Sequence, residues 1–213
     1  MRKLFSAVVS AFVLTLAMGC QASNEEYKAG EHYFVLPQAV RTSDPQKIEV
    51  TEVFWYGCPH CYDFSGKVEP WAKNLPEDVV FVRNPSTLGR RTAEIHTRAY
   101  YTAKALNKAD EMHKKLFAAY HQKKNRLKNE RDISEVFAEA GVPRDQFSSV
   151  FNSFGVQSQS MQAQSRVSAY RVTGTPNLIV NGKYRISGQS AGSNEDMLKV
   201  AAFLIEKERQ ARK

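Results

Sequence analysis

The sequence predicts an α/β fold in which a mixed sheet flanked by helices carries an inserted all-helical domain. Three observations lead to this prediction. A strand-like apolar run at 48–55 passes into a helix, residues 91–168 show helical spacing, and strand signals return after 177 ahead of a final helix. Helices that stand in sequence between two halves of one sheet indicate an α/β domain with an all-α cap.

The first half of the sheet is expected before residue 90. Ile48–Trp55 is almost continuously apolar, which is typical of a central strand covered on both faces. A helix is expected over Pro59–Asn74, because a proline follows at position 76. His32–Leu36 and Val79–Arg83 have the composition of shorter strands.

The inserted region is predicted to form five helices. They are expected near Thr92–Leu106, Asp110–Gln122, Glu130–Ala140, Arg144–Asn152 and Phe154–Tyr170. The second half of the sheet should follow as a hairpin of Leu178–Val180 and Tyr184–Ile186, for which Asn181-Gly182 predicts a two-residue turn. A helix over Asn194–Arg209 completes the expected fold.

Residues 1–22 are expected to form a signal peptide. Two basic residues precede the apolar run Leu4–Ala17, which has about the length of a signal-peptide core and is too short to span a bilayer comfortably. Small residues at Cys20 and Ala22 fit ordinary cleavage before Ser23, whereas 17–20 also resembles a lipoprotein box in which Cys20 would be lipidated. Both routes remain open, and both imply export to a compartment where dithiols stay oxidised.

Length, composition and charge bear on the number of domains and on nucleic-acid binding. The chain has 213 residues, 42% of them hydrophobic, and a formal net charge of +8. This length is enough for one large domain or for a domain with an insertion. The basic residues are spread out apart from the cluster 123–128, and no groove-reading motif accompanies them, so no nucleic-acid partner is expected.

The segment Cys58-Pro59-His60-Cys61 carries the chemistry of the chain. Two thiols separated by two residues at a strand-to-helix junction have the layout of a redox-active dithiol. Cys58 would lie at the helix N-terminus, where unpaired backbone N–H groups and the helix dipole favour the reactive thiolate. Pro59 suits the first helical position, and a protonated His60 would add positive charge near Cys58.

Other uses of these cysteines fit less well. A structural zinc site wants about four cysteine or histidine ligands, and one pair is present outside the leader. A c-type haem needs histidine directly after the second cysteine, where Tyr62 stands. A structural disulfide across so short a loop would remove little entropy from the unfolded chain. We therefore expect a redox-active disulfide, with no metal and no further cofactor.

Two segments resemble the DsbA family, the thioredoxin-fold disulfide oxidases of the bacterial periplasm. They are Phe54–Tyr62, with Pro-His between the cysteines, and Gly174–Tyr184, which contains a Thr-Pro pair. The resemblance implies a thioredoxin fold, with a thioredoxin-like domain of residues 23–90 and 169–213 around a helical domain of residues 91–168.

The resemblance also implies the remaining site residues. The Thr175–Pro176 bond should be cis, with Pro176 against the Cys58 sulfur and Thr175 exposing backbone groups to an extended substrate. Glu52 matches a buried acid of the family that would exchange protons with the thiols, and Arg83 stands where the family often has a lysine paired with that acid.

Five polar positions carry less information. Ser65 stands where the family often has a glutamate, so a proton-relay role is not expected there. The other histidines are expected to be surface or helix-face residues; they are His32, His96, His113 and His121.

The resemblance implies an oxidoreductase that donates its Cys58–Cys61 disulfide to unfolded exported proteins with free thiols. A quinone-linked DsbB-type membrane partner would then reoxidise it, and we expect it to act in the periplasm as a monomer. Two alternatives stay open. A disulfide isomerase or reductase on the same fold would usually need a dimerisation domain or a reducing partner, and a copper-binding module would hold the metal through Cys58, Cys61 and His60.

Overall fold

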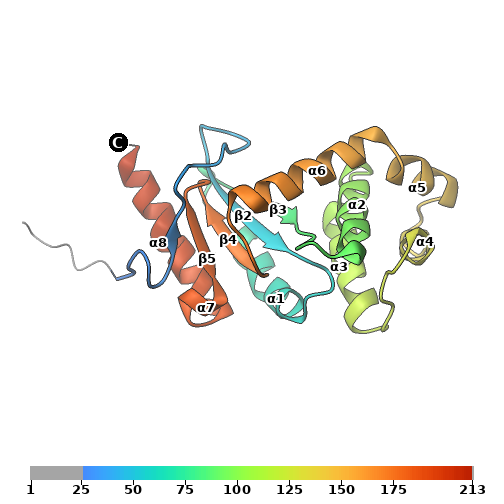
Figure 1. The fold of residues 1–213 in the computed structure, drawn as a ribbon, viewed down its shortest axis with the longest axis horizontal. Coiled ribbons are helices and arrows are strands. Elements are labelled where there is room, and N and C mark those ends of the chain that lie inside the picture. Colours follow the sequence, from blue (N-terminus) through green and yellow to red (C-terminus); the bar gives the residue numbers. More distant parts are fainter. Residues whose placement is uncertain (1–25, 213) are drawn as a thin grey trace, which may run out of the picture.

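A five-stranded mixed sheet forms the centre of the molecule (Figure 1). The computed structural model describes residues 26–212, so the expectations for the signal peptide and Cys20 lie outside the described residues. The strand order is β1-β5-β4-β2-β3. The strands are β1 (Phe34–Val35), β2 (Ile48–Phe54), β3 (Val79–Pro85), β4 (Asn177–Val180) and β5 (Tyr184–Ser187). Strands β2 and β3 pair in parallel, and the other neighbours pair antiparallel, as a mixed sheet requires.

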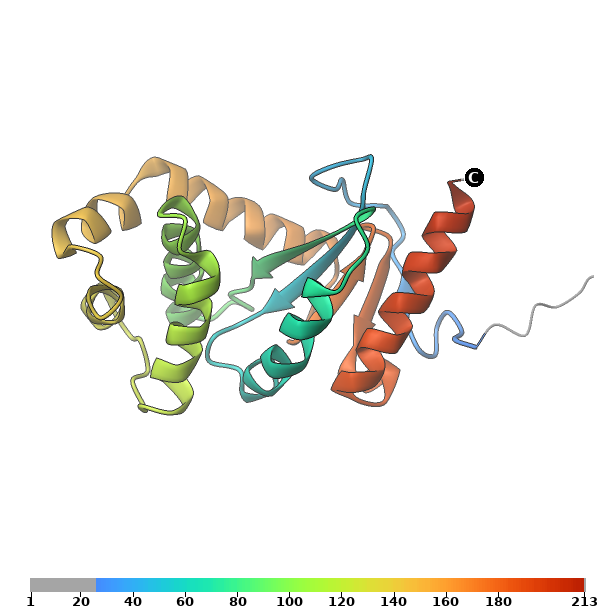
Figure 2. The ribbon, with the colours of Figure 1, turned by 180° about the vertical axis from the view of Figure 1, so that it is seen from behind.

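Helices cover both faces of this sheet. Helices α1 (Pro59–Lys73) and α8 (Asn194–Ala211) pack on one face, and the C-terminal part of α6 (Phe154–Ala169) covers the other (Figure 2). The central strand β2 is buried along its whole length, which explains its nearly continuous apolar sequence. Within the described part of the chain, no helix is both long enough and apolar enough to cross a membrane.

The inserted helices stand in sequence between β3 and β4. They are α2 (Arg91–Ala105), α3 (Ala109–His121), α4 (Glu130–Ala138), α5 (Arg144–Phe151) and α6. Together they form a lobe at the β3 side of the sheet (Figure 1). The prediction of a helical insertion is confirmed, whereas the domain limits at residues 91 and 168 stay a prediction.

The core of the helical lobe is continuous with the end of β2. Phe54 and Tyr56, which lead into the dithiol segment, belong to the same buried cluster as Leu116 and Phe117 of α3. The Phe54 and Tyr56 rings meet edge to face at 5.1 Å, and the Tyr56 and Phe117 rings do so at 5.0 Å. The lobe therefore packs directly against the segment that positions the start of α1.

The hairpin between β4 and β5 differs from the predicted two-residue turn. Val180 pairs with Tyr184, so three residues connect the strands. Asn181 takes a left-handed conformation (φ 50°), as its sequence suggests, but Lys183 leaves the ladder. The Lys183 carbonyl instead accepts a hydrogen bond from the Leu36 N–H at 2.8 Å. The Lys183 N–H donates to the Val180 carbonyl at 3.0 Å, so a turn over Asn181-Gly182 is present and Lys183 adds one residue to the connection. A second difference is the short helix α7 (Gly188–Ala191), which was not expected.

Substitution of Gly182 by alanine should destabilise the fold. Gly182 has a φ of 63°, and an added Cβ would lie 1.9 Å from the backbone oxygen of Val40. We expect Gly182→Ala to lower the free energy of unfolding by about 2–4 kcal/mol, from left-handed strain and steric overlap. Urea unfolding would measure this change.

Gly66→Ala is the matched control. Gly66 lies within α1, and an added Cβ there would meet no atom within 4 Å. Alanine has a higher helix propensity than glycine, so this variant should be as stable as the wild type or up to about 1 kcal/mol more stable. Equal stability of the two alanine variants would contradict the account of the turn.

Candidate functional site: a dithiol at a helix start

Cys58 is the N-cap of α1, and Pro59 occupies its first turn. Strand β2 ends at Phe54, and the Cys58 N–H donates back to the Trp55 carbonyl at 3.0 Å, which fixes the turn between strand and helix. Cys58 is 7% exposed, whereas Cys61 is fully buried one turn into the helix. Both cysteines are free thiols, so the structure represents the reduced dithiol.

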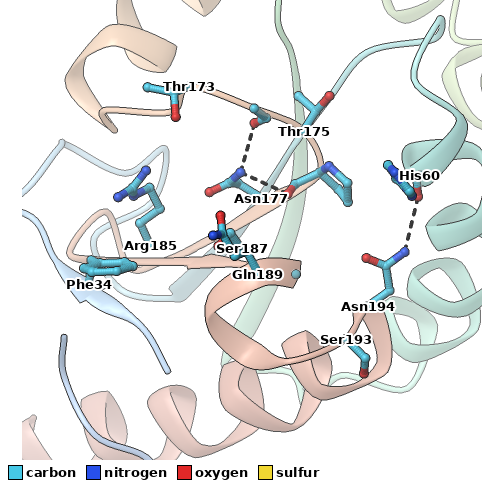
Figure 3. Close-up of a pocket in the computed structure, with 13 residues that line it drawn as sticks. Phe34, His60, Thr173, Thr175, Asn177, Arg185, Ser187, Gln189, Ser193 and Asn194 are labelled. Carbon is cyan, nitrogen blue, oxygen red and sulfur yellow. Dashed lines mark hydrogen bonds between the residues drawn. The ribbon is translucent and has the colours of Figure 1, made fainter. Parts of the chain in front are cut away.

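A loop from the other half of the sheet lies against Cys58. Its Sγ is 3.3 Å from the Thr175 carbonyl oxygen, which accepts the S–H when the thiol is protonated. The Thr175–Pro176 bond is cis, the isomer that the resemblance implied. Asn177 holds this loop, because its Nδ2 donates to the carbonyls of Gly174 and Pro176, each at 2.9 Å (Figure 3).

The two thiols differ strongly in acidity. The pKa of Cys58 is lowered to about 5, chiefly because the Cys61 thiol donates a hydrogen bond to its sulfur. Burial opposes this shift, while the Thr175 side chain and the backbone N–H groups of Cys61 and His60 add to it. The pKa of Cys61 is raised well above its ordinary value by burial and by the neighbouring Cys58 sulfur. The reduced site therefore holds one thiolate and one thiol near neutral pH.

His60 helps to lower the pKa of Cys58 through its backbone. Its side chain is exposed, and the group through which it lowers the pKa of Cys58 is its backbone N–H rather than its imidazole. Its carbonyl accepts a hydrogen bond from Asn194 Nδ2 at 3.4 Å, which links the first turn of α1 to the start of α8 (Figure 3). An electrostatic role for the imidazole stays a prediction.

Glu52 and Arg83 meet side by side on β2 and β3. Arg83 Nε lies 3.5 Å from Glu52 Oε2, and Arg83 also pairs with Asp110 of α3 at 2.9 Å. Complete burial raises the pKa of Glu52 to about 7, although Arg83 opposes the shift. Neither Glu52 oxygen has a hydrogen-bond partner among the described residues. Ser65 bonds within its own helix, donating to the Tyr62 carbonyl at 2.7 Å.

Two of the other histidines, His96 and His113, are buried rather than at the surface, each on a face of its helix. Trp55 Nε1 donates to His96 Nδ1 at 3.0 Å, so the His96 Nε2–H donates to the Leu127 carbonyl at 3.1 Å. Burial lowers the pKa of His96 to about 4, which keeps its imidazole neutral. Tyr56 Oη lies 3.2 Å from His113 Nδ1.

His121 also joins the helical lobe to the residues around the dithiol. Its Nε2–H donates to the Tyr56 carbonyl at 2.8 Å, and its ring stacks on Tyr62 at 4.7 Å. The sequence held one signal of this arrangement. His113, Phe117 and His121 recur at a spacing of four residues, which places them on one face of α3. Nothing local indicated that this face would meet the residues around Cys58.

The acidity difference predicts which thiol reacts. At pH 5–6, iodoacetamide should label Cys58 of the reduced protein and leave Cys61 largely unmodified, as peptide mass spectrometry can determine. Absorbance at 240 nm should report a thiolate with a midpoint near pH 5, following the pKa of Cys58. In the Cys58→Ser control this transition should be absent. Preferential labelling of Cys61 would contradict the assignment.

Comparisons with known proteins agree with this geometry. Residues 49–199 match the family described as DSBA-like thioredoxin domain. The chain is 40% identical to the thiol:disulfide interchange protein DsbA of Pseudomonas aeruginosa, with 100% of both chains covered. It is also 40% identical to that of Azotobacter vinelandii, over 99% of this chain and 100% of the relative.

Solved structures agree as well. The crystal structure of Pseudomonas aeruginosa DsbA matches with a TM-score of 0.84 at 41% identity, covering 89% of this chain and 98% of that one. The oxidoreductase DsbA from Xylella fastidiosa matches with a TM-score of 0.81 at 31% identity, covering 86% and 98%. With the Cys58–Cys61 dithiol at the start of α1 and a helical insertion in a mixed sheet, the chain belongs to the DsbA family of thiol:disulfide oxidoreductases.

Proposed function

We propose that this protein is a periplasmic oxidant that introduces disulfide bonds into exported proteins by donating its Cys58–Cys61 disulfide. The observation that carries the proposal is the low pKa of Cys58, about 5, beside the raised pKa of Cys61. A stabilised thiolate in the reduced form makes the corresponding disulfide a strong oxidant, because reduction of that disulfide releases a good leaving group.

The exchange proceeds in two steps. A substrate thiolate attacks the Cys58 sulfur, the Cys58–Cys61 bond breaks, and Cys61 takes up a proton as it leaves. A second substrate thiolate then attacks the substrate sulfur of the mixed disulfide and expels Cys58 as a thiolate. The substrate loses two electrons and gains a disulfide, and the enzyme is left as the reduced dithiol.

Two further groups support this order of steps. The Thr175 carbonyl already lies 3.3 Å from the Cys58 sulfur, where the backbone of an extended substrate could add to the loop as a strand. Glu52 has a pKa of about 7 in a buried setting, which suits a group that accepts and returns the proton of Cys61 near neutral pH.

Turnover requires an electron acceptor for the reduced dithiol. We assign this role to a quinone-linked DsbB-type membrane partner, as the family membership suggests. The competing activities make different predictions. An isomerase or reductase would work from the reduced form, and a copper-binding module would retain Cu(I) through the thiols and leave insulin disulfides intact.

Oxidation of a reduced two-cysteine peptide tests the proposal. One equivalent of oxidised protein should form the peptide disulfide and itself become reduced, as thiol counting by mass spectrometry would show. With bacterial membranes that contain a DsbB-type oxidase, catalytic amounts of the protein should oxidise all of the peptide. Membranes from a strain without the oxidase should not support turnover. The double variant Cys58→Ser, Cys61→Ser is the control and should leave the peptide reduced. A protein that reduces insulin rapidly but leaves the peptide dithiol unoxidised would refute the proposal.

The pH dependence of stability should reveal the thiolate. The folded pKa of Cys58 lies near 5, below the ordinary thiol value of about 8.5. A depressed folded pKa stabilises the fold fully above the unfolded pKa, and this stabilisation is lost as the pH falls through the folded pKa. The advantage of the reduced form over the oxidised form in urea should therefore shrink between pH 8 and pH 5.

Reduced Cys58→Ser protein provides the control for this measurement, because it lacks the ionising sulfur. Its stability relative to the oxidised wild type should vary less with pH over the same range. A reduced-minus-oxidised difference that stays constant from pH 8 to pH 4 would show that the Cys58 thiolate does not stabilise the reduced form.

A further inference from the structure

We propose that Arg185 makes the pocket beside the dithiol favour substrate segments with an acidic side chain about two to four residues from the reacting cysteine. The inference rests on the proposed function, because it takes the substrate to lie over Thr175–Pro176 with its sulfur at Cys58. It adds a preference in substrate sequence, and it assigns that preference to one side chain.

The pocket has a volume of about 520 Å³ and opens beside the first turn of α1. It extends from His60 and Pro176 across β5 to Arg185 and Phe34 (Figure 3). Most of its remaining lining is polar and uncharged, including Thr173, Asn177, Ser187, Gln189 and Asn194. No aspartate or glutamate lines it within the described part of the chain. Arg185 is therefore the permanently charged side chain among the described lining residues.

Arg185 is oriented but lacks an anion. Its Nη1 donates to the Arg171 carbonyl at 2.8 Å, and its guanidinium carbon lies 5.1 Å from the centre of the Phe34 ring. No ion pair joins it to a carboxylate of residues 26–212, and its buried Nε has no hydrogen-bond partner there. Burial and the nearby charge of Arg171 both lower its pKa, as expected for a cation that is partly desolvated without a counterion.

Those contacts make Arg185 suited to receive a carboxylate. The ring of Phe34 and the carbonyl of Arg171 restrict the guanidinium, so binding a carboxylate would immobilise little more of the side chain. A guanidinium can bind a carboxylate through two parallel hydrogen bonds, which a lysine cannot do. An acidic substrate side chain would also supply the counterion that Arg185 lacks among residues 26–212.

The sheet register places Arg185 within reach of a substrate bound at Cys58. Asn177 follows Pro176 and pairs with Ser187, and Arg185 lies two residues earlier on β5, opposite Ile179. Arg185 and Ser187 share one face of the sheet, because side chains alternate along a strand. Extended chains advance about 3.3 Å per residue, so the step from Ser187 to Arg185 corresponds to about two residues of an extended substrate.

Peptide oxidation tests the preference. Reduced two-cysteine peptides would carry glutamate or glutamine three residues before or three residues after the reacting cysteine, and kcat/KM would be measured with each pair. In the wild type, glutamate should raise kcat/KM by about threefold to tenfold over glutamine on at least one side. In Arg185→Gln this ratio should fall to about one, and in Arg185→Lys it should be intermediate.

Arg144→Gln is the charge-matched control, since Arg144 is exposed at the start of α5 in the helical lobe. That variant should keep the wild-type ratio, which separates a local contact from the overall positive charge. Raising the salt concentration should reduce the ratio of the wild type even if Arg185→Gln does not fold. A wild-type ratio of one on both sides, or a ratio that survives in Arg185→Gln, would overturn the inference. Failure to oxidise any of the peptides would instead refute the proposed function.

Discussion

The chemistry of this protein depends on holding the Cys58 sulfur as an anion at the first turn of α1. Hydrogen-bond donors supply this stabilisation: the Cys61 thiol contributes most, and backbone N–H groups of the same turn add to it. This arrangement works only while Cys61 stays protonated, which its complete burial ensures. The acidity of one thiol and the inertness of the other are thus consequences of a single position, the start of a helix whose second cysteine faces the core.

The helical lobe helps to support the segment that carries the dithiol. Its α3 packs Phe117 against Tyr56, and His121 donates a hydrogen bond to the Tyr56 carbonyl two residues before Cys58. His96 and His113 of the lobe are buried close to the same segment, and burial lowers the pKa of each, so neither places an unpaired charge in the core. A well-packed aromatic contact of this kind resists displacement, so the turn that carries Cys58 is held from the lobe as well as from the sheet.

The surroundings of the dithiol are aromatic on one side and polar on the other. Toward the helical lobe the surroundings are aromatic and closed, which suits a site that must keep Cys61 away from water. Toward β5 and α8 the surface is open and polar, with one arginine and no acid among its described lining residues. An open polar surface can accept many extended segments through backbone hydrogen bonds, and a single oriented cation adds a preference without narrowing the range severely.

The sequence alone determined the class of fold, the order of elements and the reactive pair. Apolar periodicity located β2 and the inserted helices, and the two-residue spacing of Cys58 and Cys61 indicated the chemistry, because both signals are local. Tertiary structure decided the rest. Lys183 bonds to Leu36 of a distant segment, His96 and His113 are buried by partners far along the chain, and Arg185 becomes part of the site only through the pairing of β4 with β5. Contacts between distant segments leave no periodic trace in the sequence, since a side chain's environment depends on which surface folds against it.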